Sequence, residues 1–186
     1  MRKKWRIQVA VTGVCVAVLL AGCAASYECL FPPLDVVEQV DLARYAGTWY
    51  EIAKYPTWFQ TGCTGAIAEY TPLADGTIRV VNTCEPIDSG PQDRIEGVAR
   101  VADPTTNAKL TVQFPGSPFP APYWVLELGA DYEYAVVGEP SRLFLWILSR
   151  TPTLDDATYQ GILDRLPAKG YDPARLEPGQ PAAAGE

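Results

Sequence analysis

Eight short segments of strand character follow one another from residue 48 onward, and their spacing constrains the fold more than any other feature. Apolar and polar residues alternate within them, and turn residues such as "LADG", "DPTTN" and "GAD" separate neighbours closely enough for antiparallel pairing. The expected strands span residues 48–55, 65–71, 77–84, 94–102, 108–114, 122–128, 132–138 and 143–149. This pattern predicts an all-β domain, an eight-stranded antiparallel up-and-down barrel that leaves no edge exposed. A sandwich of two sheets has the same strand count and remains the alternative.

The hydrophobic period changes after the last strand and predicts one C-terminal α-helix packed outside the barrel. Asp155 and Asp156 suit a helix N-terminus, so we interpret them as a helix start and not as a general acid–base pair. The apolar stripe of this helix consists of Leu154, Ile162, Leu163 and Leu166, with Tyr159 beside it. Residues 177–186, "EPGQPAAAGE", have too little apolar content to fold and are expected to be a disordered tail.

The first 22 residues have the composition of a secretory signal peptide. Four basic residues precede an apolar run over residues 7–20, which is too short to span a bilayer comfortably. The run ends in "LAGC", which resembles the lipobox of bacterial lipoproteins and makes Cys23 the expected lipidation site. An ordinary signal or an uncleaved anchor is the alternative. Residues 23–40 are then a lipidated tether and residues 41–176 the barrel and helix, while Cys15 leaves with the signal.

The charge of the processed chain limits its partners. Removing the four basic residues of the leader from the 15 Lys and Arg leaves 11 against 22 Asp and Glu, a net charge of −11. Such an acidic chain is a poor nucleic-acid binder and is repelled by anionic headgroups. Membrane attachment is therefore expected through the lipid. Stable anchoring needs more than one acyl chain, and a triacylated N-terminus meets this need. Ala24 is no inner-membrane retention residue, so we expect the outer membrane, on its periplasmic face.

The chain has no histidine, which excludes Ser–His and Cys–His nucleophile pairs and histidine-rich metal sites. We expect no metal and no cofactor. Strands 65–71 and 77–84 form a hairpin about residues 74–76, and this register brings Cys63 and Cys84 to within about a residue of facing each other. A disulfide between them is predicted. Cys29, in the tether, is left unpaired or bridges to another molecule, and its pairing with either of the other two is the alternative.

Three separated patches carry a family resemblance. Gly47-Thr48-Trp49 opens the first strand, "ADYEYAVV" brings Asp131 and Tyr132 before the seventh, and "LWILSRTP" ends the eighth with Arg150. Together they resemble the three signature regions of the lipocalins, and behind the lipobox they resemble the bacterial outer-membrane lipocalin lipoproteins, relatives of apolipoprotein D. Ala130 departs from the threonine of many lipocalins.

Strand directions place these signature residues at one end of the barrel, which must exclude water. The indole of Trp49 can close this end. The planar guanidinium of Arg150 can lie on the indole face and donate hydrogen bonds to nearby carbonyls. Gly47 permits the close approach of the chain. We therefore interpret the signature set as structural and not as the ligand site: Gly47, Trp49, Asp131, Tyr132 and Arg150.

Four loops are expected at the opposite, open end, near residues 56–64, 85–93, 115–121 and 139–142. Aromatic side chains crowd them, which usually marks a binding surface, although ordinary core packing is the alternative. The predicted ligand-binding residues are Trp58, Phe59, Phe114, Phe119, Tyr123 and Trp124. Glu51 shares the parity of Trp49, and an inward carboxylate needs a partner: Arg79, Arg100 or a ligand headgroup.

The resemblance implies a protein that binds or carries small hydrophobic ligands, fatty acids or lysophospholipids, in the cell envelope. The apolar cup with an aromatic lip agrees with this, and we expect no enzyme activity. One alternative is a thiol-dependent enzyme of the prostaglandin-synthase type, which requires Cys63 or Cys84 as a free thiolate. Another is a structural envelope lipoprotein that binds partners through its surface. The oligomeric state is left open.

Overall fold

Strand β1, Gly47–Lys54, pairs with strands from opposite ends of the sheet and thereby closes it into a barrel. The computed structural model describes residues 33–86 and 92–179. The compact unit described here begins at Leu34. The expected signal peptide, Cys23 and Cys29 lie outside the described residues, as do residues 87–91 of one expected loop and residues 180–186 of the expected tail.

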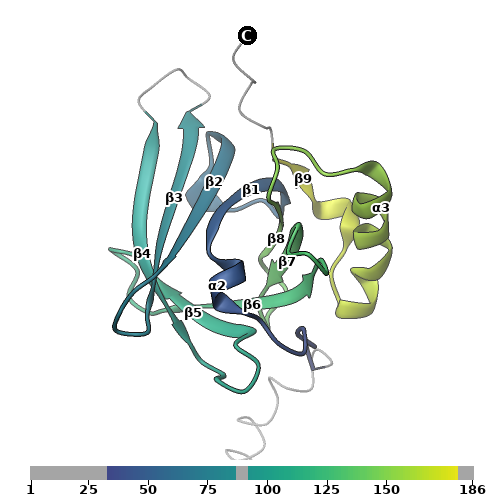
Figure 1. Ribbon diagram of the computed structural model, residues 1–186. Helices are drawn as coiled ribbons and strands as arrows, with labels where there is room; N and C mark the ends of the chain where they lie inside the picture. The colour runs from purple at the N-terminus through teal and green to yellow at the C-terminus, as the bar shows by residue number, and fades with distance from the viewer. Residues whose placement is uncertain (1–32, 87–91, 180–186) are drawn as a thin grey trace, which may run out of the picture. The chain divides into compact units, whose positions relative to one another are not determined.

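The strands follow chain order around the barrel (Figure 1). After β1 come β2 (Cys63–Pro72), β3 (Ile78–Pro86), β4 (Asp93–Val101), β5 (Lys109–Gln113), β6 (Ala121–Leu128), β7 (Tyr134–Gly138) and β8 (Leu145–Ser149). All neighbours are antiparallel, and β1 pairs with both β2 and β8. Each strand end lies within two residues of its predicted position. The predicted closed barrel is confirmed, and the two-sheet sandwich is wrong.

The ends of the domain differ from the sequence-based boundaries. Leu34 and Val40, which were expected in the tether, are buried in the core. Strand β9, Glu177–Pro178, pairs with β1 at Ala53 and Lys54, so the expected disordered tail begins with an ordered strand. The pairing has a physical reason: β2 leaves β1 after Tyr50, and β9 then satisfies the exposed backbone groups of β1.

Two apolar layers hold the structure together. The interior cluster lies inside the barrel and includes Trp49, Val80, Leu110, Val125 and Leu148. The outer cluster lies between the barrel wall and the C-terminal helix and includes Ala53, Leu126, Val136, Ile147 and Ile162. Neighbouring residues of one strand contribute to different clusters, as the alternation of strand side chains requires.

The predicted C-terminal helix is α3, Asp156–Arg165, and it lies outside the barrel (Figure 1). Asp155 is its N-cap and accepts a hydrogen bond from the Thr158 amide at 2.9 Å, which agrees with the helix-start interpretation. Arg165 forms an ion pair with Glu127 of β6 at 2.7 Å. The short helices η2 (Pro167–Lys169) and η3 (Pro173–Arg175) follow and lead into β9. Among the described residues no helix is long and apolar enough to cross a membrane.

One end of the barrel is closed by the predicted pair of aromatic ring and guanidinium. Trp49 is fully buried, and the Arg150 guanidinium lies 3.9 Å from the centre of its ring. Arg150 donates hydrogen bonds to the carbonyls of Thr48, Arg44 and Tyr132, and thus joins three segments. Gly47 has φ 94°, a left-handed backbone that favours glycine. This end, where β1 begins and β8 ends, is called the closed end.

Helix α2, Leu42–Tyr45, lies at the closed end, after its N-cap Asp41. The Trp49 indole donates to the carbonyl of Tyr45 at 2.8 Å, and the Tyr132 hydroxyl accepts from the Asp41 amide at 2.8 Å. Asp131 is exposed and lies 4.0 Å from the Arg44 guanidinium. The signature residues therefore make contacts that close this end of the barrel and hold its turns in place.

Candidate ligand-binding site

A buried ion pair lies inside the barrel toward the opposite, open end. The Lys54 ammonium is 3.3 Å from the Glu51 carboxylate, and the two side chains are 10% and 7% exposed. Glu51 pairs across the strands with Leu148, and Lys54 pairs with Trp146. Both partners belong to or pack on the interior cluster, and residues paired across strands share a face of the sheet.

Two of the three partners predicted for Glu51 are wrong, and the third, a ligand headgroup, stays a prediction. Arg79 and Arg100 are exposed, whereas the carboxylate is bound by Lys54 and accepts a hydrogen bond from the Gln60 amide at 3.0 Å. The reason is a β-bulge: the register of β1 against β8 shifts between Glu51 and Ala53. The extra residue turns Lys54 inward, although simple alternation from Trp49 would direct it outward.

The short helix η1, Trp58–Gln60, bridges this ion pair to the loop aromatics. Besides Glu51, Gln60 binds the Trp146 indole, whose Nε1 donates to the amide oxygen at 3.2 Å. Phe59 contacts Phe144, and Phe144 stacks on Trp146, with ring-centre distances of 5.8 and 6.0 Å. Trp58 packs edge-on against Phe59 and is 84% exposed. A row of four aromatic rings thus leads from solvent into the barrel.

Phe144 and Trp146 were missed in the sequence-based site. Both lie within the stretch assigned to the eighth strand, and its alternation would have directed both residues to one face. The loop before them is shaped by Glu139, whose buried carboxylate accepts hydrogen bonds from Ser141, Leu143 and Phe144.

The remaining predicted rim residues do not form one group. Phe119 is 76% exposed in the loop between β5 and β6, and Phe114 packs partly buried on the interior cluster. Trp124 faces outward, against the outer cluster, with the Lys109 ammonium 4.4 Å from its ring centre. Tyr123 points into the barrel toward α2. Neither Tyr123 nor Trp124 lies at the rim, because both belong to strand β6 and their side chains take opposite faces.

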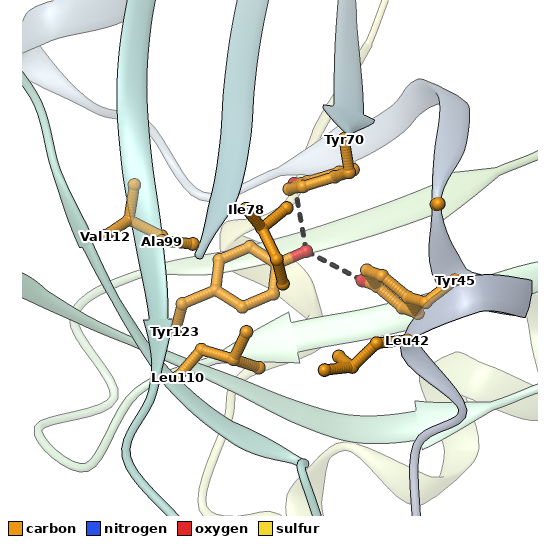
Figure 2. A pocket seen from close by; sticks show the side chains of 9 residues that line it. Leu42, Tyr45, Tyr70, Ile78, Ala99, Leu110, Val112 and Tyr123 are labelled. Carbon is orange, nitrogen blue, oxygen red and sulfur yellow. Dashed lines mark hydrogen bonds between the residues drawn. The ribbon is translucent and has the colours of Figure 1, made fainter. Parts of the chain in front are cut away.

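Tyr123 instead lines a small cavity near the closed end (Figure 2). Its hydroxyl lies between those of Tyr45 and Tyr70, at 2.7 and 3.0 Å. Burial raises the pKa of all three tyrosines, to about 12 for Tyr70. The rest of the lining is apolar and consists of Leu42, Ala46, Ile78, Ala99, Leu110 and Val112. The cavity volume of about 10 Å³ is comparable to one water molecule.

The predicted disulfide is confirmed. Cys63 and Cys84 are bonded, with their Cα atoms 5.5 Å apart. The bond joins the start of β2, directly after the η1 loop, to β3. The two sulfur atoms lie close to a carboxylate oxygen of Asp93, but as a disulfide they offer no thiolate to a metal or a substrate.

Comparisons with known proteins agree on the family. The Lipocalin-like domain family matches residues 40–181. Temperature-induced lipocalin-1 of Arabidopsis thaliana is 41% identical over 151 residues, which cover 77% of this chain and 80% of that protein. Outer membrane lipoprotein Blc of Escherichia coli strain K12 is 39% identical over 147 residues, which cover 78% of this chain and 82% of that protein.

A solved structure has the same fold at lower identity. Insecticyanin from the tobacco hornworm Manduca sexta superposes with a TM-score of 0.67 at 24% identity, over 83% of this chain and 87% of its own. The resemblance expected from Gly47, Trp49 and Arg150 is therefore confirmed along most of the described chain: the protein belongs to the lipocalin family.

Proposed function

We propose that this protein binds an anionic long-chain amphiphile, a fatty acid or lysophospholipid, inside its barrel and carries it at the outer membrane. The observation that supports this most directly is the Lys54 ammonium, which is buried beside the apolar interior cluster. An ammonium group has three N–H donors, and within residues 33–86 and 92–179 only the Glu51 carboxylate contacts it. A carboxylate or phosphate headgroup would use the remaining donors, while the acyl chain replaces contacts in the interior cluster.

Ligand binding requires the barrel to open, because the cavity of about 10 Å³ has no room for an acyl chain. The segment best suited to move is η1 with its loop. Its helix has three residues, and the hydrogen bond from the backbone N–H of Gln60 to the Thr57 carbonyl is long, at 3.3 Å. Few buried contacts and short secondary structure favour local opening. Gln60 would leave Glu51 and Trp146 in this motion.

Two substitutions with opposite effects test the headgroup site. Glu51→Gln removes the carboxylate that competes for Lys54, so hexadecanoic acid should bind more tightly. Lys54→Met should weaken binding by about tenfold or more, because a loss of this size corresponds to the free energy of one charge-assisted hydrogen bond. Lys109→Met is the matched control, since Lys109 contacts the outward-facing Trp124. Affinities come from titration calorimetry.

Unchanged affinity in both variants would contradict the assignment of the headgroup to Lys54. Absence of binding by hexadecanoic acid and by 1-palmitoyl-lysophosphatidic acid to the wild-type protein would contradict the proposed function itself. A binding difference between these two ligands separates a carboxylate preference from a phosphate preference.

The anchor is a separate part of the proposal. The "LAGC" sequence supports lipidation of Cys23, and the Escherichia coli relative is an outer membrane lipoprotein by name. We expect a Cys23→Ala variant to keep its leader and to be lost from the outer-membrane fraction. The anchor proposal fails if the variant stays in the same membrane fraction with the leader removed.

The thiol-dependent enzyme is not favoured, because Cys63 and Cys84 are joined to each other. Native mass spectrometry after mild purification distinguishes a carrier from a structural lipoprotein. Copurified lipid supports the carrier, whereas an empty barrel bound to another protein supports the structural lipoprotein.

A further inference from the structure

Three tyrosine hydroxyls meet inside the barrel although they come from distant parts of the chain. Tyr45 belongs to α2, Tyr70 to β2 and Tyr123 to β6. The Tyr123 hydroxyl is in the middle, 2.7 Å from that of Tyr45 and 3.0 Å from that of Tyr70 (Figure 2). We call this group the tyrosine cluster. It lies on the closed-end side of the barrel, away from Lys54.

The hydrogen bonds of the tyrosine cluster do not use all its donors. Three hydroxyls have three protons, and two O···O contacts use two of them. No other hydrogen bond reaches these hydroxyls from any residue that the structure describes. One proton is therefore left over, in a pocket whose other lining side chains are hydrocarbon. A buried donor without an acceptor is costly, so the site favours an occupant that brings an oxygen atom.

The size of the cavity agrees with an oxygen-sized occupant. Its volume of about 10 Å³ is close to that of one water molecule, and it lies among residues of the interior cluster such as Ile78 and Leu110. Burial raises the pKa of each tyrosine, so the hydroxyls keep their protons throughout the physiological range. A neutral oxygen is preferred, because a second carboxylate there would be buried among hydrocarbon side chains, while the nearby Arg150 already donates to three backbone carbonyls.

The distance from Lys54 suits the far end of a long ligand. The seven steps from Gly47 to Lys54 along the tilted strand β1 span roughly 18 Å of the barrel axis. An extended sixteen-carbon chain bridges such a span. A ligand whose headgroup binds Lys54 would therefore extend to the level of Gly47, whose partner across the strands is Tyr70 of the tyrosine cluster.

We propose that the tyrosine cluster binds a neutral oxygen at the inner end of the ligand, so that the preferred ligands are amphiphiles with a terminal hydroxyl or carbonyl. This inference rests on the proposed function. It separates such ligands from plain fatty acids, whose inner end is a methyl group.

Matched ligands test the inference in the wild-type protein. We compare hexadecanoic acid, 16-hydroxyhexadecanoic acid and hexadecanedioic acid by titration calorimetry. The hydroxy acid should bind about fivefold to tenfold more tightly than hexadecanoic acid. This ratio of affinities corresponds to the net free energy of one hydrogen bond. The diacid should bind more weakly than the hydroxy acid.

Phenylalanine substitutions then locate the effect. The triple variant Tyr45→Phe/Tyr70→Phe/Tyr123→Phe removes every hydroxyl donor of the tyrosine cluster and should abolish the preference for the hydroxy acid. If this variant does not fold, the comparison of the three ligands in the wild-type protein still decides the inference. Tyr50→Phe is the matched control, since the Tyr50 hydroxyl takes no part in the cluster, and it should keep the full preference.

The outcomes separate the inference from the proposed function. If hexadecanoic acid binds and the hydroxy acid binds equally or more weakly, the inference is overturned and the proposed function stands. The inference is also overturned if the preference survives in the triple phenylalanine variant, which has no hydroxyl left in the cluster. If no acid of the three binds, the inference fails, and binding of the lysophospholipid then decides whether the proposed function stands.

Discussion

Removal of the Cys63–Cys84 disulfide should destabilise the domain by an amount that follows from its place in the chain. The bond closes a loop with a sequence separation of 21 residues. The loop-closure entropy that it removes from the unfolded state corresponds to about 3 kcal/mol at 25 °C. A domain of this size has an unfolding entropy of about 0.3 kcal/mol per kelvin, so the melting temperature should fall by about 10 °C.

The assay is differential scanning calorimetry of the Cys63→Ser/Cys84→Ser variant against the oxidised wild type. The reduced wild-type protein is the matched control and should melt with the variant, because both lack only the cross-link. The reasoning is refuted if the oxidised protein and the variant melt within about 2 °C of each other, since an entropic constraint of this loop length has a larger effect.

Three further predictions concern the closed end, the tyrosine cluster and the helix. Arg150→Lys should lower the free energy of unfolding by about 2 kcal/mol in urea titrations, because a compact ammonium lacks the planar fork whose separate nitrogens reach three carbonyls around the Trp49 ring; exposed Arg79→Lys is the control, and equal effects would contradict the role of Arg150. Stability should fall as the pH rises from 10 to 12, because the unfolded chain loses the Tyr70 proton near pH 10 while the folded pKa is about 12. The slope from this group is about 1.4 kcal/mol per pH unit and should be shallower in Tyr70→Phe, so equal slopes would contradict the burial argument. Ile162→Ala should cost about 3 kcal/mol and Ile162→Val about 1 kcal/mol by the same titration, since Ile162 is fully buried between α3 and the barrel; equal losses would show that the site does not form a cavity.

Short-range sequence patterns predicted most of the fold. Alternation along each strand depends only on neighbouring residues, so the strand order and boundaries were readable before any tertiary contact was known. The disulfide was readable for the same reason, since a hairpin with a short turn sets which residues face each other. The Trp49–Arg150 contact followed from strand directions once the barrel was assumed.

The candidate site depended on features that local patterns do not encode. A single β-bulge in β1 turns Lys54 inward, and the residue types near Ala53 do not predict this bulge. Closure of the barrel brings Tyr45, Tyr70 and Tyr123 together across 78 residues of chain. The sequence by itself predicted eight antiparallel strands and their hairpin register, because these are short-range properties, and the resemblance of Gly47, Trp49 and Arg150 to the lipocalin signature favoured the closed barrel. Only the tertiary structure decided which polar groups face the interior, because that depends on bulges and on contacts between strands far apart in the chain.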